Sequence, residues 1–218
     1  MTLNCRIILV LSTALFLGSC SSAYYSAMEQ IGVHKRDILV DRVEEARDSQ
    51  EEAKVQFSSA LEQFSTLLNF DGGDLQRTYE TLEEEFEESE SRAKDVSDRI
   101  RAVESVSADL FEEWEEGLTL YTNQDLRRSS ENSLRETRVR YNQLIKAMYT
   151  AETKMEPVIN AFRDQVLFLK HNLNSRAIAS LRSELITIEG DISQLISDME
   201  ASIAESNRFL TEMELIQN

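Results

Sequence analysis

The sequence predicts an all-α protein, a long antiparallel coiled coil or up-down four-helix bundle that follows a cleaved signal peptide. Apolar residues recur at alternating spacings of three and four along most of the chain, which is typical of a left-handed coiled-coil seam. The 218 residues include one proline and six glycines, so long helices are interrupted at few places. The N-terminal residues have the composition of an export signal.

Residues 1–19 predict a lipoprotein signal peptide. A short basic start precedes an apolar run over residues 7–17, which is far shorter than the roughly 20 residues that a membrane-spanning helix needs. The run ends at Leu17-Gly18-Ser19-Cys20, which resembles the lipobox of bacterial lipoproteins, in which the cysteine is diacylated. We therefore expect Cys20 to be the lipid-attachment residue. The alternative is an ordinary cleaved signal that leaves Cys20 free.

The mature chain, residues 20–218, is expected to form one helical coiled-coil domain. It carries 22 basic and 40 acidic side chains, and this excess of negative charge disfavours nucleic acid and a broad anionic lipid surface as partners. Cys5 would leave with the signal and Cys20 would be acylated, so no disulfide is expected. In lipoproteins of Gram-negative bacteria a residue other than aspartate after the cysteine implies sorting to the outer membrane, and Ser21 fits that rule.

Three breaks divide the mature chain into helices of similar length. Two glycines at residues 72 and 73 end the first helix, and Asp74 can cap the second. Asn123 or Asp125 can cap the third helix, and residues 171–175 separate it from the fourth. The predicted helices cover roughly residues 24–70, 74–121, 124–171 and 175–215.

Each predicted helix has one stripe of seam positions with the coiled-coil spacing. In the first helix they are Leu39, Val43, Ala46, Gln50, Ala53, Phe57, Ala60, Phe64 and Leu67. In the second they run from Leu75, Tyr79 and Leu82 through Phe86, Ser89, Ala93, Val96, Ile100, Val103 and Ser107 to Leu110, Trp114, Gly117 and Tyr121. In the third they are Leu134, Thr137, Tyr141, Leu144, Met148, Ala151, Met155, Val158, Phe162, Val166 and Leu169. In the fourth they are Ile178, Leu181, Leu185, Ile188, Ile192, Leu195, Met199, Ile203, Phe209 and Met213.

Short turns between long helices favour antiparallel neighbours. The second predicted helix has 16 acidic and 5 basic residues, whereas the third has 6 acidic and 9 basic residues, so their flanks are complementary in charge. Each exposed pair contributes under about 1 kcal/mol, so these charges select pairing and register more than they stabilise. Pro157 inside the third helix removes one backbone hydrogen bond and is expected to kink it.

Four seam positions are polar. They form either a buried polar site or, as we favour, a device that fixes helix register. These positions are Gln50, Ser89, Ser107 and Thr137.

The sequence shows no motif for catalysis or metal binding. A di-iron bundle needs Glu-x-x-His on two helices, but neither His34 nor His171 has a glutamate three residues before it. The H-E-x-x-H and G-x-x-x-x-G-K motifs are also absent from the sequence. We therefore expect no enzyme activity, no cofactor, no metal site and no small-molecule substrate. The acidic run at residues 83–90 is interpreted as a solvated helix face, with loose cation binding as the alternative.

Two groups of basic residues should lie at the same end of an up-down bundle. We predict that they contact lipid head groups, at about 1 kcal/mol per charge. Ordinary pairing with nearby aspartates is the alternative. The residues concerned are His34, Lys35, Arg36, Arg127 and Arg128.

Residues 24–29 and 34–47 resemble a family of uncharacterised bacterial envelope proteins that is defined as a domain of unknown function. Residues 50–54 and 57–64 continue the similarity, which covers most of the mature chain. The resemblance implies a lipoprotein with a coiled-coil body and brings no activity, substrate or catalytic residue with it.

Together these features predict a non-enzymatic, lipid-anchored coiled-coil protein that acts as an envelope scaffold or adaptor. We expect it on the periplasmic face of the outer membrane, attached through Cys20, with a protein partner or a second copy of itself as its binding partner. The alternatives are a membrane-shaping helical module and a carboxylate-rich, cation-binding bundle.

Overall fold

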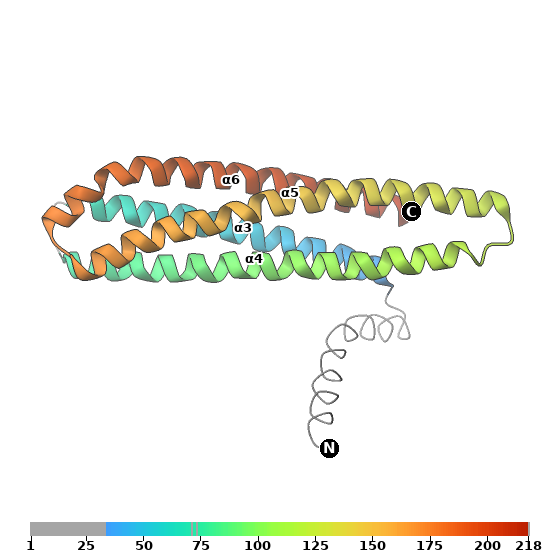
Figure 1. Cartoon of the computed structure of the whole chain (residues 1–218), viewed down its shortest axis with the longest axis horizontal. Helices are drawn as coiled ribbons and strands as arrows, with labels where there is room; N and C mark the ends of the chain where they lie inside the picture. Colours follow the sequence, from blue (N-terminus) through green and yellow to red (C-terminus); the bar gives the residue numbers. More distant parts are fainter. Residues whose placement is uncertain (1–33, 71, 73, 218) are drawn as a thin grey trace, which may run out of the picture.

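The computed structural model describes residues 34–70, 72 and 74–217, which form four helices. These are α3 (Lys35–Leu68), α4 (Leu75–Leu118), α5 (Gln124–His171) and α6 (Ser175–Gln217). They run up and down in one elongated bundle (Figure 1), which confirms the predicted fold class. The predicted signal peptide, Cys20 and the predicted helical residues 24–33 lie outside the described residues.

The helices begin where the sequence provides capping side chains. Asp74 accepts a hydrogen bond from the backbone N–H of Arg77 (3.2 Å) at the start of α4. Of the two candidates before α5, Asn123 is the N-cap, and it accepts from two backbone N–H groups. Gly72 in the first turn has φ of 149°, a conformation that a side chain would disfavour. Local turn chemistry therefore sets the helix boundaries near the predicted ones.

The four helices close into a ring in chain order. α3 packs on α4, α4 on α5, α5 on α6, and α6 returns to α3, while the backbones of the two diagonal pairs stay apart in the described residues and approach only through core side chains. This arrangement is a closed bundle and not a pair of separate hairpins. Every neighbouring pair except α3 and α6 is joined by a short turn, so the ring follows from the connectivity.

The predicted stripes form the core. All nine predicted seam positions of α3 are buried, including the polar Gln50. Near the middle of the bundle Ile100, Leu144 and Leu195 have no exposed surface. The ring of Phe162 meets Phe64 edge-on, with centroids 5.3 Å apart. Burial of each such side chain contributes about 1.5–3 kcal/mol, so the seam dominates stability.

The seam prediction is wrong near the ends of α4 and α6. Tyr121 is exposed and Trp114 is half-buried, because α3 begins only at Lys35 and does not cover the end of α4. In α6, Ile203 is half-buried and the buried positions are Ser202 and Ser206. The alternating spacing of three and four that starts at Met199 continues through these serines. The prediction was wrong because it chose Ile203, which is apolar, over Ser202, which has the seam spacing.

The α4–α5 hairpin extends beyond the other two helices. Lys35 at the start of α3 is ion-paired with Glu113, and Glu212 near the end of α6 is ion-paired with Arg140 (2.9 Å). Figure 1 shows the hairpin continuing past both of these ends. A small second core of Phe111, Leu118 and Leu134 holds this extension together. One end of the bundle is therefore a two-helix projection, and we call it the open end.

Charge complementarity between α4 and α5 is confirmed by ion pairs along their interface. Lys170 binds Glu83 (2.9 Å), Arg138 binds Glu115 (2.5 Å), and Arg163 binds Glu90. The pairs follow one antiparallel register over most of the helix length. Within the described part of the chain, none of the helices is long and apolar enough to cross a membrane.

The Glu83–Lys170 pair predicts how α4–α5 packing depends on pH. The hydrogen bond from Lys170 is the main cause that lowers the pKa of Glu83 below its ordinary value of 4.5. A lowered folded-state pKa stabilises the protein above 4.5, and this contribution is lost as the pH falls through the folded-state value. In denaturant unfolding, Lys170→Gln should lower the free energy of unfolding slightly at neutral pH and leave it unchanged in strong acid, because the pair is exposed and the carboxyl is then protonated.

Lys146→Gln removes the same charge from α5 and serves as the control. Two results would contradict a stabilising Glu83–Lys170 pair. One is a difference in the free energy of unfolding between wild type and Lys170→Gln that persists unchanged below the pKa of carboxyl groups. The other is the same dependence on pH in Lys146→Gln.

Candidate functional site at the open end

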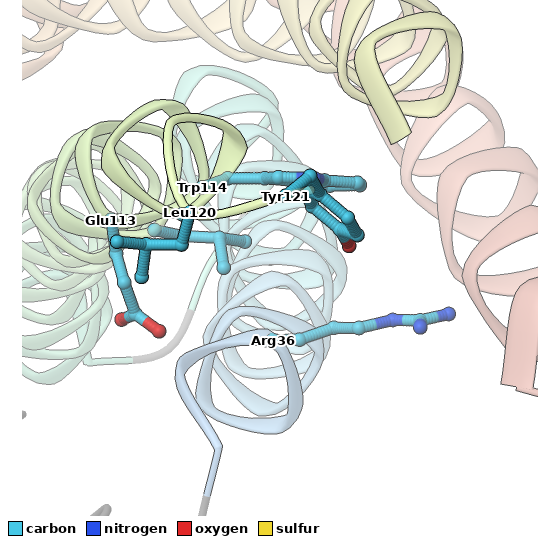
Figure 2. Close-up of a pocket in the computed structure, with 7 residues that line it drawn as sticks. Arg36, Glu113, Trp114, Leu120 and Tyr121 are labelled. Atoms are coloured by element: carbon cyan, nitrogen blue, oxygen red, sulfur yellow. The ribbon is translucent and has the colours of Figure 1, made fainter. Parts of the chain in front are cut away.

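A groove of about 510 Å³ opens where α3 begins and the α4–α5 hairpin continues. Arg36 forms one side, and the last turns of α4 with the first residues of the α4–α5 turn form the other, as Figure 2 shows. The α4 wall combines aromatic and aliphatic side chains with one carboxylate. The residues that line the groove are Arg36, Leu110, Glu113, Trp114, Gly117, Leu120 and Tyr121.

The groove exists because of helix length and residue size. In a four-helix cross-section this face of α4 would be covered by α3, but α3 starts opposite Glu113. A Cβ added at Gly117 would meet no atom of the described residues within 4 Å, so the space above it is open among them. The indole N–H of Trp114 donates to the hydroxyl of Ser130 on α5 (2.8 Å) and so fixes the ring across the hairpin. The wall is thus rigid and its apolar face is open.

Large apolar side chains also cluster at the tip of the hairpin. Leu120 is 81% exposed, Leu126 is 57% exposed, and Tyr121 is 40% exposed. Scattered exposed apolar residues are ordinary on a protein surface, but a group at one tip is a candidate for an interaction surface.

The predicted basic residues do lie at this one end, as the up-down topology requires. His34 is exposed at the N-cap position of α3. Lys35 is only 9% exposed and is ion-paired with Glu113, and Arg36 donates from Nη2 to the backbone carbonyl of Met213 (2.8 Å). Lys35 and Arg36 therefore tie the start of α3 to α4 and α6.

The two arginines of the hairpin are bonded within their own helix. Arg127 pairs with Glu131 (2.9 Å) and Arg128 pairs with Asp125 (2.7 Å). Both pairs are well exposed, so they compete with water and contribute little to stability. Arg127 and Arg128 can exchange these partners for others at small cost, and contact with head groups stays a prediction. Lipid attachment at Cys20 lies outside the described residues.

The acidic run at residues 83–90 is used in contacts between helices. Glu83 and Glu90 bind Lys170 and Arg163 of α5. On the other side, Glu85 accepts hydrogen bonds from Gln56 of α3. Across the described residues no group of three or more His, Cys, Asp or Glu side chains is placed to hold a metal ion.

A polar layer lies inside the bundle at the level of Gln50. Its amide is fully buried, and neither its oxygen nor its nitrogen has a hydrogen-bond partner among the described residues. The buried hydroxyl of Ser202 is likewise without a partner in the part of the chain described. Arg47 bonds Asn207 and Lys54 lies 3.9 Å from Glu200, so α3 and α6 are in antiparallel register there and Gln50 lies about level with Ala204, between Ser202 and Ser206.

The other polar seam positions differ from Gln50. The hydroxyls of Ser89 and Ser107 donate to backbone carbonyls of their own helix, of Glu85 (2.7 Å) and Glu104 (2.9 Å). These serines cost little to bury and are simply small residues on the seam. Of the four predicted positions, only Gln50 has buried side-chain polar atoms without a partner in the described chain.

These features define a class: an elongated, up-down coiled-coil bundle with an acidic surface and an open, apolar-lined end. The chain belongs to the family described as "Protein of unknown function (DUF2959)", whose match covers residues 24–213. No curated protein and no solved structure matches the chain. The family match confirms the resemblance to a domain of unknown function and assigns no activity.

Replacement of the buried amide tests the polar layer. A buried amide without a hydrogen bond destabilises a protein by about 1–3 kcal/mol, so Gln50→Leu should raise the free energy of unfolding by about 1 kcal/mol or more. Gln56→Leu on the same helix is the matched control, because the Gln56 amide donates to the backbone carbonyl of Glu85 (3.0 Å), and this variant should be destabilised.

Both variants are measured by denaturant unfolding, with the oligomeric state checked by light scattering. If Gln50→Leu is destabilised as much as Gln56→Leu, the amide has a partner in solution. If it changes oligomeric state, Gln50 fixes register, as coiled-coil polar residues do elsewhere.

Proposed function

We propose that this protein is a non-enzymatic, lipid-anchored scaffold or adaptor of the bacterial cell envelope, held at the periplasmic face of the outer membrane by acylated Cys20. The observation that carries the proposal is the position of the open end. The start of α3 and the tip of the α4–α5 hairpin lie at the same end of the bundle (Figure 1), so a membrane anchor that precedes α3 would bring the hairpin tip to the membrane.

The length of the bundle supports a spacer role. The longest helix, α5, has 48 residues, which corresponds to a rod of about 70 Å. A rod that is attached at one end presents its opposite end, with the α3–α4 and α5–α6 turns, far from the membrane. Such a body is suited to bridging a membrane to a distant partner.

The surface supports a partner with basic side chains. The full chain has a net charge of −17, and most of its acidic residues lie on the outside of the bundle. Exposed charge of one sign steers association with oppositely charged surfaces and discourages non-specific contact with others of the same sign. We therefore propose a basic protein surface, or a basic patch on a second copy, as the partner.

Acylation of Cys20 is tested by metabolic labelling with a palmitate analogue in cells that express the full chain. Wild-type protein should be labelled and should fractionate with membranes, and Cys20→Ala should lose both properties. Cys5→Ala is the control and should keep both, because Cys5 would be removed with the signal. Unlabelled wild-type protein would contradict the anchor.

The scaffold role is tested by crosslinking in intact cells. We expect a defined crosslinked product, either with another envelope protein or between two copies, that depends on Cys20. Recovery of the monomer alone, under conditions in which a known envelope complex is crosslinked, would contradict the role.

Contact between the hairpin tip and head groups is tested with unacylated protein and liposomes. Arg127→Glu and Arg128→Glu together should weaken binding by about 1 kcal/mol per charge replaced. Arg135→Glu, which lies on the same helix farther from the tip, should bind as wild type does. Equal binding to liposomes by wild type, the double variant and Arg135→Glu would contradict contact between the hairpin tip and head groups.

A further inference from the structure

The groove at the open end lies directly beside the point where the chain enters α3. Lys35 is the first residue of α3, and its pairing with Glu113 places the start of this helix at the mouth of the groove. The family match begins at residue 24, so the ten residues from 24 to 33 are part of the shared domain although they lie outside the described residues.

The sequence of this segment carries an apolar stripe of its own. His34, the N-cap of α3, has extended backbone and separates the segment from the α3 seam, in which Lys35 and Leu39 are buried. Within the segment, Tyr24, Met28 and Ile31 recur at the helical spacings of four and three, and all three are apolar or aromatic. The segment contains one charged residue, Glu29, which falls outside this stripe. Its pattern is that of a seam without a described partner.

We propose that residues 24–33 dock in the groove and cover the apolar face of the α4–α5 hairpin. A segment that runs antiparallel to α4 from the Lys35–Glu113 pair would bring Ile31 near Gly117, and Met28 near Leu120. At a helical rise of about 1.5 Å per residue, ten residues span about 15 Å, which is enough to cover α4 from Glu113 to its end at Leu118.

The chemistry of the groove suits this occupant. Trp114, Leu120 and Tyr121 offer an apolar wall, and the missing Cβ of Gly117 leaves room for a large side chain. The buried Nε of Arg36 has no hydrogen-bond partner among the described residues, and a backbone carbonyl of the docked segment would supply an acceptor. A nearly uncharged segment of this chain thus complements the groove in shape, polarity and position.

Docking would determine how the bundle stands on the membrane. Cys20 precedes Tyr24 by only four residues, so a docked segment would bring the lipid-attachment residue next to the hairpin tip at Leu120 and Leu126. The bundle would then stand on its open end instead of swinging on a free tether. This orientation rests on the proposed acylation of Cys20, whereas docking itself does not.

Trp114, the only tryptophan, reports on the groove directly. The experiment uses the mature chain, residues 20–218, with Cys20→Ser so that no lipid is attached. Met28→Asp with Ile31→Asp should shift the Trp114 emission to longer wavelength and increase its quenching by acrylamide. Ser26→Asp with Gln30→Asp adds the same charge to the opposite face of the segment and should leave both signals as in wild type. Far-UV circular dichroism checks that all three proteins are folded.

A disulfide tests the register in the same unacylated background. Ile31→Cys with Gly117→Cys should form an intramolecular disulfide on mild oxidation, and Gln30→Cys with Gly117→Cys should not. The proposal is overturned if neither pair crosslinks. It is also overturned if only disulfide-linked dimers form, because a second copy would then be the occupant of the groove. Shielding of Trp114 only after liposomes are added would overturn it as well, because lipid would then be the occupant. None of these results depends on acylation, so failure of docking and failure of the anchor are distinguishable.

Discussion

Burial of one apolar stripe on each of four long helices is the interaction on which the rest of the structure depends. Each fully buried large side chain contributes about 1.5–3 kcal/mol, whereas each exposed ion pair contributes less than about 1 kcal/mol. The ion pairs between α4 and α5 therefore favour this helix pairing and this register, whereas burial of the apolar stripes stabilises the fold. Because the stripes have a period near 3.5, the helices must remain nearly parallel over their whole length, and an elongated body follows.

The unequal lengths of the helices create the open end. α4 and α5 have 44 and 48 residues, but α3 has 34, so α3 leaves the end of the hairpin uncovered. The buried Lys35 and the Arg36 contact with Met213 close the four-helix section at this level. Beyond it, the apolar face around Trp114 is the groove. The proposed docking of residues 24–33 and the proposed anchor at Cys20 both concern this end, and together they would make it the attachment point of the bundle.

The sequence allowed the fold class, the turns and most of the core to be predicted, because periodicity and capping are local signals. Asp74 and Asn123 cap the helices that follow them, and the α3 stripe is buried throughout. Ser202 and Ser206 were missed because the apolar Ile203 beside them was chosen in their place, although spacing alone had put Ser89 and Ser107 on the seam of α4. The groove could not be predicted either, since it depends on where one helix ends relative to another. The buried position of Lys35 is likewise a property of the packing, and its charge alone suggested an exposed residue.

Small-angle X-ray scattering on the mature, unacylated chain tests the closed bundle most directly. The structure predicts a rod whose length is that of α5, about 70 Å, with the cross-section of four packed helices. Two hairpins that extend away from each other would give a particle nearly twice as long with half the cross-section. A scattering curve of that second kind would contradict the closed ring of helices and, with it, the groove and the shared end on which the functional proposals depend.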